Sequence, residues 1–249
     1  MIACLCPVYR RPKLTENVVA CFLAQKCDIP ARLIVVDDGE SFYSEENDKY
    51  IVISQSERFP DLGSKYNFAA DLAIKKYGAE ILVVWEDDDI YLPWHLQSIV
   101  HVLRRTNAQW AKPSLVFTAG EDELGTVPFN RVTYNFHAAI SLTSEAWKEV
   151  QWPTDGKMNY DSRFMCALED KFGEAGDTLT YNPTPSYVFR FGTTKSYHGQ
   201  GLCMGNLEDT NWYKMVPMIT KATPIKKLEP KFDDETRRVM AKYVEQTGS

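Results

Sequence analysis

The chain of 249 residues has few of the features that mark several common protein classes. It contains no apolar run approaching the ~20 residues that a membrane-spanning helix requires, and no signal-peptide pattern precedes its first apolar stretch. Its net charge of -6 and pI near 5.3 provide no overall basic surface for binding nucleic acid or a membrane. These absences predict a cytoplasmic protein without a transmembrane segment.

Cysteine and glycine signatures of metal and phosphate sites are missing as well. The six cysteines are scattered, with no Cys-x-x-Cys pair and no histidine at zinc-binding spacing. The glycine-rich loop of phosphate-loop hydrolases is absent, which excludes that class. The turn Tyr9-Arg10-Arg11-Pro12 contains no glycine either, and this disfavours a nucleotidyltransferase.

The most informative stretch is an apolar run that leads directly into four acidic residues. Ile81–Trp85 is typical of a strand buried on both faces, and Glu86–Asp89 follow it without a break. Adjacent carboxylates repel one another, and a divalent cation is a common way to relieve that repulsion. An acidic run is more often a solvated loop, but its position at the end of a buried strand favours a metal site that holds an anionic ligand. The ligand spacing of an EF-hand is absent.

The first 110 residues follow the pattern of a doubly wound α/β half. Strands are predicted over Ile2–Val8 and Arg32–Val36 around a helix at 14–25, which forms a βαβ unit with parallel strands. A short strand at 51–54 and helices over 62–77 and 92–105 complete this half. Asp37 and Asp38 end the second strand, so they are expected at the same sheet edge as Glu86–Asp89.

The remainder of the chain changes character. Helical spacing predicts a helix over Tyr160–Phe172, strand-like segments are expected at 178–181 and 186–191, and the charged residues 223–249 are predicted to be helical near 233–243. We therefore expect a mixed, mainly parallel central sheet flanked by helices, with residues 111–222 as its second half.

Four segments in their order along the chain carry a family resemblance: CPVYRRP, IVVDDG, WEDDDIYLPWHL and YDSRF. Together they resemble the family 2 glycosyltransferases with the GT-A fold, over roughly residues 2–200. The resemblance implies that residues 1–110 bind a nucleotide-sugar donor, most plausibly a UDP-sugar, and that residues 111–222 carry the acceptor and catalytic groups.

The resemblance also implies roles for individual residues on the donor side. Pro7 and Tyr9 would line the nucleotide site, Asp38 would hold the base, and Asp87 would face the ribose. Asp88 would hold Mn²⁺ or Mg²⁺, and the same alignment allows Glu86 or Asp89 in that role. His198 is a second candidate metal ligand, because imidazole suits Mn²⁺, although a solvated loop histidine is an equal alternative.

One departure from the family pattern concerns the diphosphate. In the helix predicted over 62–77, the family often has an arginine directly before an asparagine. This chain has Tyr66 before Asn67 there. Lys65 is the nearest cation, and Arg10 and Arg11 compete with it for the role of diphosphate partner.

On the acceptor side the resemblance implies an inverting reaction in which Asp161 of YDSRF is the general base. The alternative is an ordinary first-turn aspartate that interacts with the helix dipole. Glu169 and Asp170 form a second candidate pair, two turns further along the helix. The acceptor stays open among glycans, lipids, proteins and modified nucleic acid, and the oligomeric state is not set by the sequence. A nucleotidyltransferase and a non-catalytic nucleotide- or sugar-binding protein are the competing functions.

Overall fold

Four parallel strands form the centre of the protein, as the apolar runs predict. The computed structural model describes residues 1–119, 124–128, 136–157, 159–190 and 228–247. The parallel strands are β1 (Ile2–Val8), β2 (Ala31–Asp37), β4 (Tyr50–Ser54) and β5 (Ile81–Val84). In the register of this sheet, Leu5 of β1 lies opposite Ile34 of β2 and Val84 of β5. Every residue of β1 is buried, which agrees with its continuous apolar sequence.

Shorter strands from the rest of the chain extend this core into a sheet of eight strands in the order β11-β7-β10-β5-β1-β2-β4-β3. The added strands are β3 (Glu45–Glu46), β7 (Trp110–Lys112), β10 (Ser141–Thr143) and β11 (Gly176–Asp177). β10 runs antiparallel to both of its neighbours, and β3 runs antiparallel to β4. The sheet is therefore mixed but parallel at its centre, as expected.

A second sheet of four strands lies beside the first, in the order β6-β12-β8-β9. Its strands are β6 (Ile90–Tyr91), β8 (Leu115–Ala119), β9 (Leu124–Pro128) and β12 (Tyr187–Arg190). β6 begins directly after the acidic residues that follow β5. This sheet therefore links the end of a central strand to segments that come much later in the chain.

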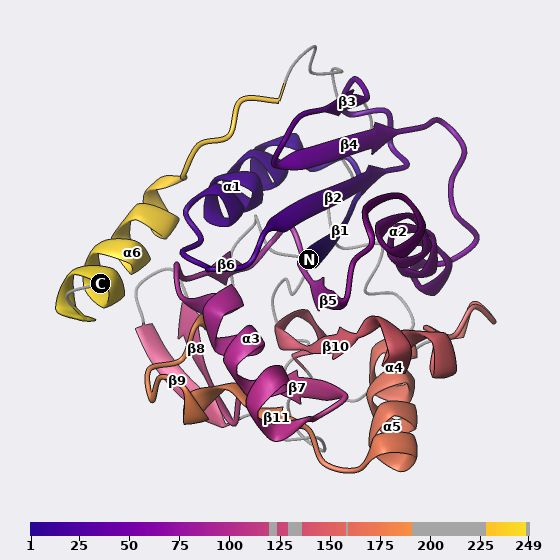
Figure 1. Cartoon of the computed structure of the whole chain (residues 1–249). Helices are drawn as coiled ribbons and strands as arrows, with labels where there is room; N and C mark the ends of the chain where they lie inside the picture. The colour runs from indigo at the N-terminus through magenta and orange to yellow at the C-terminus, as the bar shows by residue number, and fades with distance from the viewer. Residues whose placement is uncertain (120–123, 129–135, 158, 191–227, 248–249) are drawn as a thin grey trace.

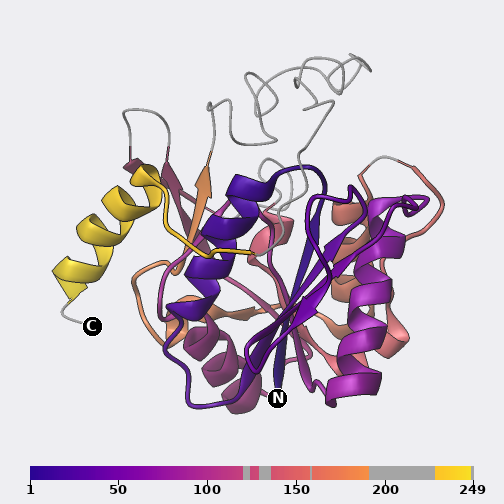
Figure 2. The same ribbon diagram turned by 90° about the horizontal axis from the view of Figure 1, so that it is seen from above.

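Helices cover both faces of the large sheet (Figure 2). One face carries α1 (Pro12–Leu23) and α3 (His95–Thr106), and the other carries α2 (Leu62–Tyr77), α4 (Ser144–Glu149) and α5 (Tyr160–Phe172). The last helix, α6 (Asp234–Thr247), lies on the α1 side of the molecule (Figure 1). Two short 3₁₀ helices span His137–Ala139 and Thr178–Thr180.

Local signals explain most of the helix boundaries. The side chain of Asp61 caps α2 by accepting a hydrogen bond from the backbone N–H of Ser64 at 2.7 Å. Gly78 ends the same helix at a φ of 65°, a left-handed conformation that suits glycine. Pro12 opens α1, where its missing N–H costs no helical hydrogen bond.

Two sequence predictions about elements are wrong. The helix expected from Leu92 begins only at His95, because the backbone N–H of Leu92 donates to the carbonyl of Ser186 at 2.9 Å and belongs to a strand connection. The strand expected over 178–181 is a 3₁₀ turn, because the side chain of Asp177 accepts a hydrogen bond from the backbone N–H of Leu179.

The C-terminal segment packs against the rest of the protein. Leu228 and Val239 are buried, and the Tyr243 ring stacks on Phe117 of β8 with ring centroids 3.8 Å apart. The backbone N–H of Asp233 donates to the side chain of Asn17 in α1. The predicted helix near 233–243 is therefore present. The C-terminal segment contacts α1, which covers the large sheet, and β8, which belongs to the second sheet.

Neither a membrane span nor a disulfide is found in the part of the chain that the structure describes. None of its helices combines the length and the hydropathy needed to cross a membrane. The five described cysteines are free thiols. The cytoplasmic location stays a prediction.

Burial of His95 leads to a pH-dependent stability. Its side chain is 1% exposed and packs against the rings of Trp85 and Tyr91, and burial lowers its pKa to about 3. The unfolded state then binds more protons between pH 6.5 and 3, so this contribution to stability is present above pH 6.5 and is lost as the pH falls. From pH 7 to pH 5 the loss is about 2 kcal/mol.

Urea unfolding of the wild type and of His95→Asn at both pH values tests this. The asparagine can still bond to Ser186, whose hydroxyl lies 2.9 Å from Nδ1 of His95, but it does not titrate. We expect the stability difference between the two proteins to shift in favour of the variant at pH 5. An unchanged difference would contradict the burial argument.

Candidate active site

The carboxyl ends of three adjacent parallel strands, β2, β1 and β5, carry the polar residues of the site. At the end of β2 the two aspartates have different tasks. Asp37 closes the turn, since its carboxylate accepts hydrogen bonds from the backbone N–H groups of Gly39 and Ser41 and from the hydroxyl of Ser54. Asp38, the residue expected to hold the base, follows β2 directly and contacts Lys65 of α2.

Asp38 is buried and lies among three donors. Its Oδ1 is 2.6 Å from Nζ of Lys65, and its Oδ2 accepts from the backbone N–H of Phe59 at 3.1 Å. The Nε of Arg58 is 3.2 Å from the same Oδ2. These donors hold the carboxylate in one orientation, as a residue that reads a ligand group requires.

Lys65 joins Asp38 to the end of β1. Its Nζ also donates to the carbonyl of Val8 at 2.5 Å, and its side chain is 5% exposed. Burial lowers the pKa of Lys65, although the neighbouring Asp38 favours the charged form. Lys65, one of the candidate diphosphate partners, is thus bonded to Asp38 and helps to orient the carboxylate of that residue.

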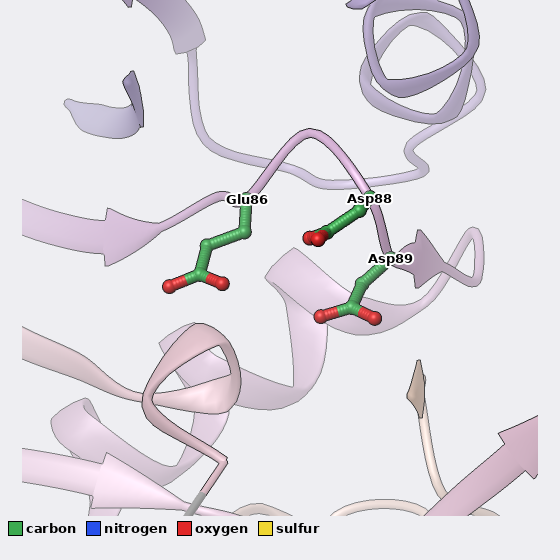
Figure 3. A group of neighbouring side chains, drawn as sticks. All are labelled: Glu86, Asp88 and Asp89. Atoms are coloured by element: carbon green, nitrogen blue, oxygen red, sulfur yellow. The ribbon is translucent and has the colours of Figure 1, made fainter. Parts of the chain in front are cut away.

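The acidic residues after β5 form the second part of the site (Figure 3). Glu86 precedes the bend of the loop and Asp88 and Asp89 follow it, and their carboxylates converge on one side of the chain. One ligand oxygen from each of these three residues lies within 4.8 Å of the others. Hard cations such as Mg²⁺ and Mn²⁺ prefer carboxylate oxygens, so this group suits such an ion.

Arg11, from the turn after β1, neutralises part of this charge. Its guanidinium lies 2.9 Å from Oδ1 of Asp87 and 3.1 Å from Oδ2 of Asp88. Burial raises the pKa of Asp87 to about 7, with Arg11 opposing the shift and Asp88 adding to it. Oδ2 of Asp87 has no hydrogen-bond partner among the described residues. The carboxylates therefore already bind one cationic group, and one of them keeps an unsatisfied oxygen.

Glu86 is held by residues that the sequence did not single out for the site. Its Oε1 accepts from the Tyr66 hydroxyl and lies 3.2 Å from Nδ1 of His137. The indole N–H of Trp152 donates to Nε2 of His137 at 2.7 Å. Because an indole can only donate, Nε2 must accept, so the ring proton is on Nδ1 and points at Glu86. Tyr66 and His137 thus both contact the same oxygen of Glu86, Oε1.

Asp89 serves to anchor the loop. Its Oδ1 accepts from the backbone N–H of Arg190 at 3.0 Å, and its Oδ2 accepts from the hydroxyl of Tyr187. Burial, with the charges of Asp88 and Glu86, raises its pKa well above the usual range. Asp89 is therefore committed to β12, which favours Asp88 and Glu86 over Asp89 as metal ligands.

Arg190 completes this anchor. Its Nε donates to the backbone carbonyl of Asp88, and its Nη1 lies 3.0 Å from Asp233 and 3.6 Å from Glu235. A side chain that is 1% exposed thus ties the acidic loop to the start of α6. No local pattern in the sequence indicated this, because Arg190 and Asp88 are 102 residues apart.

Asp161 lies in the first turn of α5, near the residues that hold Glu86. Its Oδ1 accepts from the backbone N–H of Ser162 at 2.7 Å, which is a local helix-start contact. The preceding Tyr160 stacks on Tyr66 at 6.4 Å and meets the edge of His137 at 5.6 Å. The start of α5 therefore contacts Tyr66 and His137, the two residues that bond to Glu86.

The other predicted residues are placed as follows. Pro7 is buried in β1 opposite Val36, and Tyr9 is partly exposed just beyond the strand. The structure brings the predicted donor-side residues together at the strand ends. His198, the second candidate metal ligand, lies outside the described residues.

Comparison with known proteins identifies the class. Residues 4–151 match the model of glycosyl transferase family 2, which is more than half of the chain. The chain therefore belongs to glycosyl transferase family 2. No curated protein sequence matches it.

Solved structures share the GT-A fold at low sequence identity. The 1–349 portion of Staphylococcus aureus TarS in complex with UDP-GlcNAc has a TM-score of 0.57 and 15% identity, over 86% of this chain and 63% of that one. The same portion without a named ligand gives a TM-score of 0.55 and 14% identity, over 99% and 73%. Against the longer TarS structure, this chain spans 38% of its length, with a TM-score of 0.55 and 15% identity over 79% of this chain. The predicted fold is thereby confirmed.

Proposed function

We propose that this protein transfers a sugar from a nucleotide-sugar, most plausibly a UDP-sugar, to an acceptor hydroxyl in a metal-dependent reaction that inverts the anomeric centre. The observation that carries the proposal is the continuous set of contacts across three strand ends. It runs from Asp38 through Lys65 to the end of β1, and from there through Arg11 to Asp87 and Asp88. A nucleoside diphosphate that lies along this edge can meet base-binding, ribose-binding and diphosphate-binding groups in turn.

The donor is proposed as a uridine nucleotide for two reasons. A carboxylate such as Asp38 can accept the ring N–H of uracil, and the adjacent ring of Tyr9 can stack on the base. TarS of S. aureus, whose fold this chain shares, is known in complexes with UDP and with UDP-GlcNAc.

The residues present fit Mn²⁺ or Mg²⁺. Asp88 and Glu86 supply hard oxygen ligands, and Asp88 already binds the cationic group of Arg11. A bound divalent cation supplies neutralisation of the charge that builds on the leaving diphosphate. Asp87 would accept a hydrogen bond from a ribose hydroxyl, and Asp89 with Arg190 holds the loop in position.

Arg11 is our candidate for the diphosphate partner. Its side chain pairs with Asp87 and Asp88 of the acidic loop. The ammonium group of Lys65, in contrast, is bonded to Asp38. A planar guanidinium binds phosphate oxygens in the bidentate manner it uses for carboxylates. Arg11 can therefore keep one contact to Asp87 while it turns other N–H groups to the diphosphate.

Asp161 is proposed as the general base on the acceptor side. It would take the proton of the acceptor hydroxyl as the oxygen attacks the anomeric carbon opposite the diphosphate. A single displacement of this kind inverts the configuration. The family assignment favours this activity over nucleotidyl transfer and over binding without catalysis.

Thermal unfolding with UDP and Mn²⁺, each alone and together, tests the proposal. A ligand that binds only the folded state raises the melting temperature by mass action, so UDP with Mn²⁺ should give the largest rise. In Asp38→Ala this rise should shrink for UDP but persist for inorganic diphosphate with Mn²⁺, because only UDP carries a base. No rise with UDP in the wild type would count against the nucleotide-sugar donor.

A further inference from the structure

The Arg58 side chain lies over both groups that the proposed function assigns to the nucleobase. Its Cζ is 3.6 Å from the centroid of the Tyr9 ring, and its Nε is 3.2 Å from Oδ2 of Asp38. A guanidinium is planar, stacks on aromatic faces and donates N–H groups in its plane. A uracil base presents the same two features, a flat face and an N–H at its edge.

Gly39 allows this arrangement. A Cβ at this position would come within 3.0 Å of Cδ2 of Tyr9 and 2.8 Å of Cγ of Arg10. The lack of a side chain therefore lets the Tyr9 ring pack directly against the turn after β2. Two cations lie against the ring, Arg58 with its Cζ 3.6 Å from the centroid and Arg10 with its Cζ at 5.1 Å.

The space between Arg58 and Tyr9 is too small for a base. Stacked planar groups are separated by about the 3.5–4.0 Å of ordinary carbon contacts, and the guanidinium already lies at 3.6 Å from the ring centroid. Asp38 is itself only 2% exposed in this arrangement. A base therefore reaches Tyr9 and Asp38 only when Arg58 moves away.

Arg58 is the donor to Asp38 that can move at low cost. Lys65 is buried and is bonded to the Val8 carbonyl as well, and Phe59 contributes a backbone N–H. The Arg58 side chain is 56% exposed, so solvent can replace its contacts when it leaves. The remaining two donors still orient Asp38 after Arg58 has moved.

We propose that Arg58 occupies the nucleobase position in the free protein and competes with the donor nucleotide for it. This inference rests on the proposed function, since it takes Tyr9 and Asp38 as the base-binding groups. Arg58 is thus an internal competitor that lowers the affinity for any nucleotide whose base must stack on Tyr9. It protects Asp38 from solvent when no nucleotide is bound.

Calorimetric titration of wild type and Arg58→Ala with UDP and with inorganic diphosphate, both in the presence of Mn²⁺, tests the competition. We expect Arg58→Ala to bind UDP about tenfold more tightly, equal to about 1.4 kcal/mol, which is the scale of an exposed cation–π contact together with an exposed ion pair. The affinity for diphosphate should not increase, because diphosphate has no base. Arg58→Gln, which is also neutral but longer, should change the UDP affinity in the same direction.

The controls separate this inference from the function on which it rests. Unchanged or weaker UDP binding by both folded variants, with clear binding by the wild type, would overturn the competition and leave the proposed function standing. Equal tightening for UDP and diphosphate would also overturn it, because the effect would then be one of charge. If neither the wild type nor the variants bind UDP or diphosphate, the proposed function fails and this inference fails with it.

Discussion

Asp161→Asn is expected to reduce turnover by about 10²–10⁴-fold while donor binding stays near that of the wild type. Asparagine keeps the shape of the side chain and can still accept from the backbone N–H of Ser162, the contact that Asp161 makes at 2.7 Å. It cannot take a proton from an acceptor hydroxyl. The fall should therefore appear in kcat with UDP-sugar and Mn²⁺, and calorimetry with UDP should show no matching loss.

Asp170→Asn is the matched control, because Asp170 is an exposed carboxylate two turns further along the same helix. Its turnover should equal that of the wild type. A large loss in Asp170→Asn with normal turnover in Asp161→Asn would move the base to the second candidate pair. Retention of the donor's anomeric configuration in the product, measured by NMR, would exclude the single displacement altogether.

Asp88→Asn is expected to abolish the metal dependence of UDP binding. Loss of a residue that only orients a metal ligand typically costs about 10–100-fold in metal affinity, so loss of a ligand should cost at least ~100-fold. The structural basis is the convergence of Asp88 with Glu86 and Asp89, whose ligand oxygens lie within 4.8 Å. Titration of Mn²⁺ with and without UDP measures the effect.

Asp89→Asn distinguishes between neighbouring positions in the acidic loop. Both oxygens of Asp89 already accept hydrogen bonds from β12, at the Arg190 backbone and the Tyr187 hydroxyl. An asparagine can keep the first bond and accommodate the second by turning the tyrosine hydroxyl. We therefore expect Asp89→Asn to bind Mn²⁺ nearly as the wild type does. A strong loss there, with normal binding in Asp88→Asn, would mean that the metal role belongs one residue further along.

The sequence by itself determined the central sheet and the identity of the acidic group. Continuous apolar runs such as Ile2–Val8 can be buried on both faces only as strands of a covered parallel sheet, so their pattern is enough to predict them. Carboxylates that directly follow two such strands must meet at one edge of that sheet. This local logic is enough to predict that Asp38 and Glu86–Asp89 lie at the same edge of the sheet.

Tertiary structure decided how each of those residues is used. Whether a carboxylate serves as anchor or ligand depends on which donors reach it, and these come from distant parts of the chain. Asp89 is held by Arg190, Glu86 by His137 and Asp38 by Arg58 and Lys65. Hydrophobic periodicity carries no information about such pairings, because they arise when segments far apart in sequence pack side by side. The contacts of Arg58 with Tyr9 and Asp38, on which the proposed competition rests, therefore exist only in the folded protein.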